Sequence, residues 1–282
     1  MSLPPHITYD MPDADYRDAP GLSSTAIKHL LKSPAHYQWA RMHRREKVSF
    51  DLGHAAHAKI LGVGLGVAVY RDEDLTPSGN VSTKAATVQW AAEQRAAGLA
   101  PITPEQYAAV DAMAEKVATH PVAGKLIGSG IGRPEVSLFW DDPQTSVACK
   151  GRIDYLHDDA PVAVDLKTTR DADPRKFGRI AADYGYAEQA VHYLHGLTAV
   201  RGDMDAAFYQ VLVETEAPHH VSVVQLDEMF RLLAETRVRH AIDTYAECLK
   251  TNEWPGYPAL IHPVAAPGWY GADEDEEMEE VS

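Results

Sequence analysis

The sequence predicts an α/β fold in which a mixed β-sheet is flanked by helices and preceded by a largely helical N-terminal part. Three short runs rich in β-branched and aromatic residues follow one another, as is typical of buried strands. A helical pattern at 186–200 and two further strand-like runs, at 206–214 and 219–225, come after them. This alternation places helices against a sheet. The three central runs are residues 135–140, 146–155 and 162–168.

The N-terminal part begins with residues 1–20, which are rich in Pro and Asp and show no periodicity, so they predict an irregular arm. The residues Leu22-Ser23-Ser24 then begin a helix whose apolar side chains recur at helical spacing. Pro34 ends this helix, and another covers 35–45. Its Tyr37 and Trp39 are more typical of a core than of a surface that stacks on nucleic acid.

Helical patterns also cover residues 50–61, 80–97 and 103–117. We expect the last two helices to form a lobe beside the sheet. Residues 62–66 read GVGLG, but the spacing is not that of a dinucleotide-binding loop, and they predict a flexible turn. Towards the other end, a long amphipathic helix is predicted at 227–250, and the residues WPGYP break the chain after it.

Residues 146–168 form a predicted β-hairpin around the polar turn HDDAP at 157–161. Because strand side chains alternate, Asp165 and Lys167 lie on one face and Leu166 on the other. Asp154, at the end of the first strand, is placed where it can meet Asp165. Buried carboxylates are costly unless their charge is offset, and a hard cation such as Mg²⁺ would offset it. The alternative is a surface hairpin whose acids are solvated.

Four segments together resemble the PD-(D/E)xK nuclease core. They are Glu135, the run CKGRID that ends at Asp154, the run VDLKTT with Asp165 and Lys167, and the run YGYAEQAVHYL. More narrowly, the chain is similar to the nuclease domain of exodeoxyribonuclease VIII, the RecE-type exonuclease of phages and prophages. The flanking runs that share this likeness are GLSSTAIKHLLKSPAHYQ, GHAAHAKIL and ECLKTNEWPGYP.

The resemblance covers about residues 21–258 and implies one nuclease domain. Within it, residues 21–130 are mainly helical and residues 131–250 form the core. Residues 259–282 are then an irregular acidic tail. This tail departs from the family's usual pattern, and we interpret it as a solubilising end rather than a cover for a DNA groove.

The candidate site residues come from the acids of the hairpin and from this resemblance. The assigned metal ligands are His57, Glu135, Asp154, Asp165 and the carbonyl of Leu166. The assigned catalytic residues are Lys167, Asp165, Asp154, Glu135, Gln189 and Tyr193. Lys167 beside several acids is expected to orient water and phosphate electrostatically, with general base as the second role.

The histidine at position 57 shares a helix face with His54. Two histidines at this spacing could indicate zinc, but no HExxH pattern or companion cysteines accompany them. The resemblance instead implies that His57 reaches the metal centre. His54 is then a neighbour or a packing residue.

The net charge of −15 argues against non-specific adhesion to DNA. However, seven acids lie in the terminal run 273–280, and basic side chains gather in sequence around the proposed site. This distribution is compatible with a local basic groove. The assigned DNA-binding residues are Lys150, Arg152, Arg170, Arg175, Lys176 and Arg179.

The resemblance implies a 5′→3′ exonuclease that uses Mg²⁺, with Mn²⁺ as a substitute, on double-stranded DNA ends. It also implies 3′ overhangs for recombination, a ring-like trimer or tetramer, and a single-strand annealing protein as partner. No run is long and apolar enough for a membrane span, so a cytoplasmic protein is expected.

Two rival interpretations remain. One is another PD-(D/E)xK nuclease, of a restriction or CRISPR-associated type. The two cysteines, Cys149 and Cys248, exclude a form with a four-cysteine iron–sulphur cluster. The other rival is a DNA-binding module of the same fold without activity.

Overall fold

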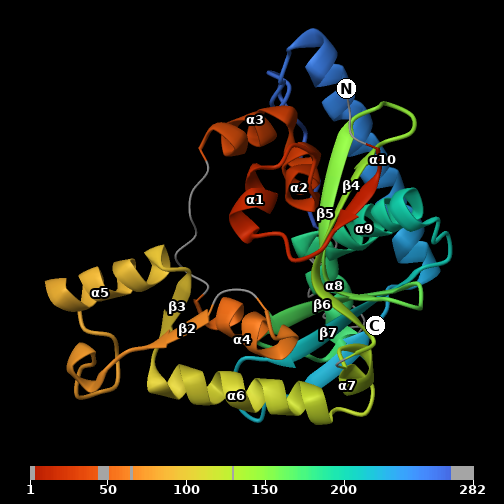
Figure 1. Ribbon diagram of the computed structural model, residues 1–282. Coiled ribbons are helices and arrows are strands. Elements are labelled where there is room, and N and C mark those ends of the chain that lie inside the picture. Colours follow the sequence, from red (N-terminus) through yellow and green to blue (C-terminus); the bar gives the residue numbers. More distant parts are fainter. Residues whose placement is uncertain (1–3, 44–50, 64–65, 129, 268–282) are drawn as a thin grey trace, which may run out of the picture.

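A six-stranded mixed sheet forms the centre of the protein, as the computed structural model shows (Figure 1). The structure describes residues 4–43, 51–63, 66–128 and 130–267. The strand order is β1-β4-β5-β6-β7-β8. The bounds are β1 His6–Thr8, β4 Gly132–Asp141, β5 Ala148–His157, β6 Val162–Thr169, β7 Ala207–Glu214 and β8 Val221–Val224.

The helices flank this sheet, and the α/β fold predicted from the sequence is confirmed. Their bounds are α1 Asp13–Asp18, α2 Ser24–Lys32, α3 Pro34–Met42, α4 Asp51–Leu61, α5 Ala85–Ala96, α6 Pro104–Thr119, α7 Ala123–Leu126, α8 Pro174–Tyr184, α9 Tyr186–Arg201 and α10 Glu228–Thr251. A short 3₁₀ helix covers Asp72–Asp74. Among the described residues, we find no helix with the length and apolar character that a membrane crossing requires.

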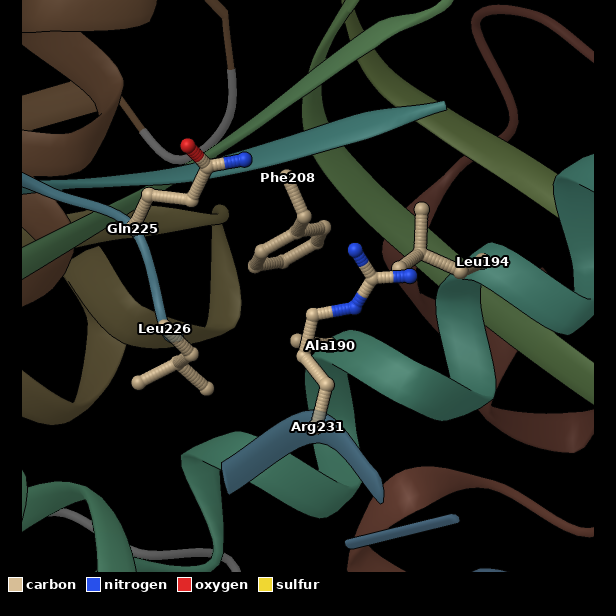
Figure 2. A pocket seen from close by; sticks show the side chains of 6 residues that line it. All are labelled: Ala190, Leu194, Phe208, Gln225, Leu226 and Arg231. Atoms are coloured by element: carbon tan, nitrogen blue, oxygen red, sulfur yellow. The ribbon is translucent and has the colours of Figure 1, made fainter. Parts of the chain in front are cut away.

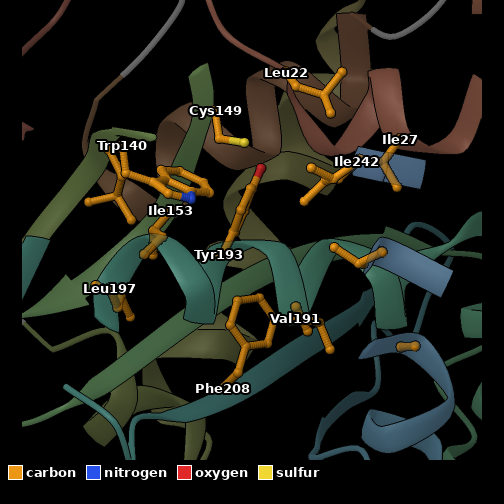
Figure 3. Close-up of a cluster of buried hydrophobic side chains, with 14 of the residues drawn as sticks. Leu22, Ile27, Trp140, Cys149, Ile153, Val191, Tyr193, Leu197, Phe208 and Ile242 are labelled. Carbon is orange, nitrogen blue, oxygen red and sulfur yellow. The ribbon is translucent and has the colours of Figure 1, made fainter. Parts of the chain in front are cut away.

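The two faces of the sheet carry separate apolar layers. On one face, Ile27 of α2, Trp140 of β4, Leu197 of α9 and Ile242 of α10 belong to one buried cluster (Figure 3). On the other face, α4 and α6 pack against the sheet through a second cluster that includes Met113. Burial of these side chains supplies most of the driving force for folding.

The central hairpin forms as the sequence predicts. Strands β5 and β6 are antiparallel, with Tyr155 opposite Val164, and the polar turn joins them. The next connection differs, because β6 and β7 are parallel and the chain between them runs through α8 and α9. A parallel neighbour needs such a crossover. As a result, the end of β6 lies beside the beginning of α9.

The N-terminal arm is more regular than the sequence suggests. Strand β1 pairs antiparallel with β4, with Thr8 opposite Ser137, and α1 follows it. The prediction of an irregular arm over residues 1–20 is therefore wrong for this part. A three-residue strand and a six-residue helix are too short to show periodicity. Strand β1 is held by its pairing with β4, and α1 is held by side chains of β5 rather than by its own sequence.

A second, two-stranded sheet was also missed. Strand β2 (Gly66–Val69) pairs in parallel with β3 (Leu99–Ile102), and α5 lies in the chain between them. The predicted turn at 62–66 holds for Gly62, whereas Gly66 already begins β2 and residues 64–65 lie outside the described residues. Both strands have four residues, and Pro101 in β3 is a residue that usually argues against a strand.

After α10 the chain has no regular structure up to residue 267 and is exposed except at Trp254, which stacks on Tyr37. The acidic run 273–280 lies outside the described residues. The division of the chain into an arm, a nuclease domain and a tail remains a proposal.

Candidate metal and catalytic site

The end of β6 carries the aspartate and the lysine of the hairpin on one face. Lys167 Nζ lies 2.9 Å from Oδ1 and 2.8 Å from Oδ2 of Asp165, as the alternation of strand side chains predicts. Asp165 is 1% exposed and Lys167 is 19% exposed. The lysine is therefore held by a buried acid while part of it stays accessible.

His57, on α4, brings two further acids into the site. Its Nδ1 lies 3.3 Å from Glu135 Oε1, and its Nε2 lies 3.0 Å from Asp154 Oδ2. The helix approaches the end of β6 closely at Gly53, where a Cβ atom would lie 3.3 Å from the Thr168 hydroxyl oxygen. His57 follows one turn later on the same side of α4.

His57, Glu135 and Asp154 form a cluster whose potential ligand atoms all lie within 4.8 Å of one another. One imidazole nitrogen and two carboxylates suit a divalent cation such as Mg²⁺ or Mn²⁺. All three side chains are partly exposed, between 15% and 26%, so solvent can reach them. The donor set therefore fits the metal that the sequence implies.

The charges of the site explain its altered pKa values. Burial alone would lower the pKa of His57, but the charges of Asp154 and Glu135 and the hydrogen bonds with them raise it to about 10. Without a metal, a protonated imidazole thus stands between the two carboxylates. The pKa of Asp154 is lowered although burial would raise it, because His57, Lys167 and the backbone N–H of Leu166 stabilise its anion.

The Asp165–Lys167 pair shows opposing effects. Burial raises the pKa of Asp165 to about 6, with Lys167 opposing the shift and Asp154 adding to it. Burial would lower the pKa of Lys167, but the charges of Asp165 and Asp154 outweigh it and raise this pKa. The lysine is therefore a stable cation in the metal-free protein.

Helix α9 closes the site from the other side. Gln189 Nε2 donates to Asp165 Oδ1 at 3.0 Å and lies 3.4 Å from Tyr193 Oη. Tyr193 is 6% exposed and also belongs to the core, so it takes part both in the site and in packing. Burial raises the pKa of Tyr193.

The structure brings together most of the predicted site. His57, Glu135, Asp154, Asp165, Lys167, Gln189 and Tyr193 are joined by the contacts above. Asp165 stands beside the three-residue cluster rather than in it, and the backbone N–H of Leu166 donates to Asp154 Oδ2 at 2.7 Å. The roles of Asp165 and of the Leu166 carbonyl as ligands stay predictions. His54 is exposed, so it is not a packing residue.

Two of the six predicted DNA-binding side chains are already engaged by the protein. Lys150 is 6% exposed, and its Nζ donates to the carbonyls of Tyr16, Arg17 and Ala19. The side chain of Arg152 is 10% exposed and donates to Met11 O at 2.9 Å. The prediction that these two cations face DNA is wrong, because both point toward the N-terminal residues.

The other four basic side chains lie exposed on and before α8. Arg175 and Lys176 pair with Asp173 and Asp171, and Arg179 is 90% exposed with Asp183 at 3.9 Å. Arg170 is exposed after the end of β6. Their contact with DNA stays a prediction, and the nearby acids reduce the positive charge of this surface.

Two residues near the site were missed from the sequence. The ring of Tyr186, at the start of α9, has Lys167 Nζ 4.6 Å from its centroid. Tyr16 of α1 interacts electrostatically with Tyr193, Arg152 and Glu135, and burial raises its pKa well above the usual value. Tyr186 stands in the recognised run YGYAEQ, which was a usable signal, whereas nothing in the sequence around Tyr16 marks it.

Two small hollows lie elsewhere. One, of about 10 Å³, has room for a single water and is lined by Ala190, Leu194, Phe208, Gln225, Leu226 and Arg231 (Figure 2). The other, of about 250 Å³, lies between α3 and the end of α10 and includes Arg41 and Trp254. Neither is lined by the acids of the site.

The fold and the arrangement of acids and lysine define a protein of the PD-(D/E)xK class. The chain belongs to the family described as PDDEXK-like domain of unknown function (DUF3799), which matches residues 23–262. No curated protein matches the chain.

Among solved structures, a putative exonuclease from Eubacterium rectale is similar in fold. Its TM-score is 0.60 at 10% identity, over 92% of this chain and 97% of that one. A phage-related exonuclease from Haemophilus somnus 129PT matches with a TM-score of 0.34 at 10% identity, over 83% and 96% of the two chains. An alkaline exonuclease from Laribacter hongkongensis matches with a TM-score of 0.27 at 17% identity, over 71% of this chain and 91% of that one. The similarity to the first structure supports the fold, whereas the TM-scores of the other two are too low to support any argument.

Proposed function

We propose that this protein is a metal-dependent exodeoxyribonuclease that hydrolyses phosphodiester bonds from the ends of double-stranded DNA. The observation that carries the proposal is the cluster of His57, Glu135 and Asp154 beside the Asp165–Lys167 pair. A divalent cation bound there would lower the pKa of a bound water and stabilise charge on the phosphoryl oxygens. Mg²⁺ is the proposed ion, with Mn²⁺ as a substitute.

The chain's own residues then have distinct tasks. His57, Glu135 and Asp154 would hold the cation, with Asp165 and the Leu166 carbonyl as further ligands. Lys167 is a cation whose side chain is partly exposed, and its ammonium would donate a hydrogen bond to the attacking water or to a phosphoryl oxygen. Its high pKa favours this electrostatic role over that of a general base.

Gln189 and Tyr193 support Asp165 from α9. The Gln189 amide donates to Asp165 Oδ1 and thereby fixes the direction in which the second oxygen points. Tyr193 Oη lies beside the same amide, and the ring of Tyr193 is locked in the core. Residues held in this way keep a site preorganised for the charge that develops in the reaction.

The finer parts of the proposal come from the sequence resemblance to the RecE-type exonucleases. They are 5′→3′ polarity, 3′ overhangs for recombination, a ring-like trimer or tetramer, an annealing protein as partner, and action in the cytoplasm. The similarity in fold to the putative exonuclease from Eubacterium rectale supports the coarser activity.

A decisive experiment uses linear duplex DNA labelled at the 5′ or the 3′ end, with Mg²⁺, Mn²⁺ or EDTA, beside a closed circular plasmid. We expect metal-dependent release of mononucleotides from the linear DNA, with the 5′ label released first, and an intact circle. Nicking of the circle would favour an endonuclease of the same class. Binding of duplex without any cleavage in either metal would favour a DNA-binding module and overturn the proposal.

A further inference from the structure

The N-terminal residues are tied to the site by two cations of β5. Lys150 and Arg152 are two positions apart, so their side chains leave the strand on the same face. Lys150 Nζ donates to three carbonyls at the end of α1, at 2.8, 3.1 and 2.6 Å. Because these carbonyls are among the last of the helix, the lysine satisfies acceptors that have no partner within α1.

Arg152 connects the same segment to a proposed metal ligand. Its Nη2 donates to Met11 O at 2.9 Å and its Nε donates to Ser137 Oγ at 3.1 Å. Its Nη1 lies 3.5 Å from Glu135 Oε2. The guanidinium carbon also lies 4.3 Å from the ring centroid of Tyr16. One planar group therefore joins β1–α1, β4 and the carboxylate of Glu135.

Glu135 needs such support, because its backbone is strained. Its φ angle is +51°, a left-handed conformation that is uncommon for a residue with a side chain. A conformation of this kind persists only where its surroundings fix it. His57 holds one carboxylate oxygen of Glu135 and Arg152 lies beside the other, so two separate elements determine where this side chain points.

We infer that Arg152 is a positioning residue for Glu135, and that the segment from β1 to α1 is a strap which completes the metal site by holding Arg152 in place. The inference rests on the proposed metal-binding function of the site. Arg152 itself need not touch DNA or the metal. The strap is thereby part of the functional site, although it lies more than a hundred residues before Glu135 in the sequence.

A competing electrostatic effect can be separated from positioning. A cation beside Glu135 repels a metal ion, so removing its charge alone would strengthen metal binding. If Arg152 instead positions Glu135, even a substitution by lysine should weaken metal binding, because lysine has the charge of arginine but not its planar fork. The substitutions Arg152→Lys and Arg152→Gln therefore distinguish the two effects: positioning predicts a loss in both, whereas electrostatics alone predicts no change in the first and a gain in the second.

The test is calorimetric titration of the DNA-free protein with Mn²⁺. We expect both Arg152 variants to bind Mn²⁺ about 10- to 100-fold more weakly, which is the usual cost of losing a group that supports a metal ligand. Tyr16→Leu should show a smaller loss in the same direction, whereas Tyr16→Phe, which keeps the ring under the guanidinium, should bind as the parent does. The Tyr16 variants also cover the case in which an Arg152 variant does not fold.

Arg133 offers a matched control. It lies on the same strand as Glu135, 54% exposed, with its guanidinium carbon 4.5 Å from the ring centroid of Tyr9. Arg133→Lys changes a contact of Tyr9 that does not involve Arg152, so it should leave the hold on Arg152 and the Mn²⁺ affinity unchanged. An equal loss in this variant would mean that the segment acts through general stability, and would overturn the inference.

Two further outcomes separate this inference from the proposed function. If the parent binds Mn²⁺ in a manner abolished by Glu135→Gln, and the Arg152 variants weaken that binding, the inference stands even if no DNA is cleaved. If Arg152→Gln binds Mn²⁺ as tightly as the parent or more tightly, the positioning role is wrong even if DNA is cleaved normally.

Discussion

The register of β4 and β5 places Glu135 opposite Asp154, but these two residues are not paired in the ladder. The flanking pairs, Pro134 with Tyr155 and Val136 with Ile153, are both present. The two carboxylates instead turn toward His57 of α4. Local disruption of a ladder beside a site is a frequent way to redirect side chains, and here it points two acids at one ligand position.

The first prediction concerns these two acids. Glu135→Gln and Asp154→Asn keep the shape of each side chain but remove its charge. Each variant should therefore bind Mn²⁺ more than about 100-fold more weakly than the parent. Calorimetric titration and a thermal shift with Mn²⁺ measure this loss. Asp158→Asn, which changes an acid in the hairpin turn paired with Arg133, is the control. Unchanged Mn²⁺ binding in both site variants would place the metal elsewhere.

The second prediction separates the two roles of Lys167. Arginine cannot act as a base because it stays protonated, but it retains a positive charge and hydrogen-bond donors. If Lys167 acts electrostatically, Lys167→Arg should retain measurable cleavage of end-labelled duplex, whereas Lys167→Gln should lose about 100-fold or more. Equal inactivity of the two variants, with normal circular dichroism and metal binding, would instead favour a general base.

The third prediction concerns the close approach of β5 and α9. A Cβ atom on Gly151 would lie 2.8 Å from Tyr193 Cδ1, and both sides of this contact are buried. Gly151→Ala should therefore lower the free energy of unfolding by about 1–3 kcal/mol and displace Tyr193 from Gln189. Urea unfolding gives the first effect.

Gly178 is a matched control for this substitution. It lies within α8, and a Cβ atom there would meet nothing within 4 Å. Gly178→Ala should raise the free energy of unfolding by about 0.5–1 kcal/mol, because glycine is the poorer helix former. A destabilised Gly178→Ala, or an unaffected Gly151→Ala, would contradict the packing described.

The fourth prediction tests the basic surface around α8. The Arg175 guanidinium makes three hydrogen bonds to the Asp173 carboxylate, so its charge is already compensated, whereas Arg170 has no ion pair to an acid among the described residues. Arg170→Ala should reduce the salt dependence of duplex binding, measured in Ca²⁺, by about one unit of slope, and Arg175→Ala should reduce it less. The same slope in both variants and the parent would exclude Arg170 and Arg175 from the DNA interface.

Much of the fold could be predicted because it depends on short-range patterns. The hairpin of β5 and β6 follows from apolar runs around a polar turn, and the common face of Asp165 and Lys167 follows from strand geometry alone. The caps of α2 and α6 at Ser23 and Thr103 are likewise local. These features require no knowledge of distant parts of the chain.

The errors have a common cause, because they depend on contacts between distant residues. Lys150 and Arg152 look like free cations in the sequence, and only the fold shows that residues 11–19 accept their hydrogen bonds. The three-residue cluster also depends on contacts between distant residues, although it is not an error. His57 comes from a helix about eighty positions before Glu135, and only the family resemblance, not a local pattern, predicted that it reaches the site.

The last prediction concerns His192, which is fully buried on α9 behind the site. Its Nε2 lies 3.0 Å from Leu22 O and 3.1 Å from Lys150 O, and its Nδ1 has no partner among the described residues. Burial lowers the pKa of His192 to about 4, against the two carbonyl contacts that raise it. The folded protein therefore keeps this imidazole neutral at a pH where the unfolded chain takes up a proton.

The sign of the effect follows from this difference. As the pH falls below about 6.5, His192 is protonated in the unfolded state but stays neutral in the folded state. The free energy of unfolding therefore decreases by about 1.4 kcal/mol per pH unit until about pH 4. His192→Gln removes the titrating group and retains an amide that can donate to the same carbonyls. Between pH 6.5 and pH 5 the parent should therefore lose about 1.6 kcal/mol more stability than the variant, as measured by urea unfolding at each pH. Parallel losses in the two proteins would show that His192 does not resist protonation in the fold.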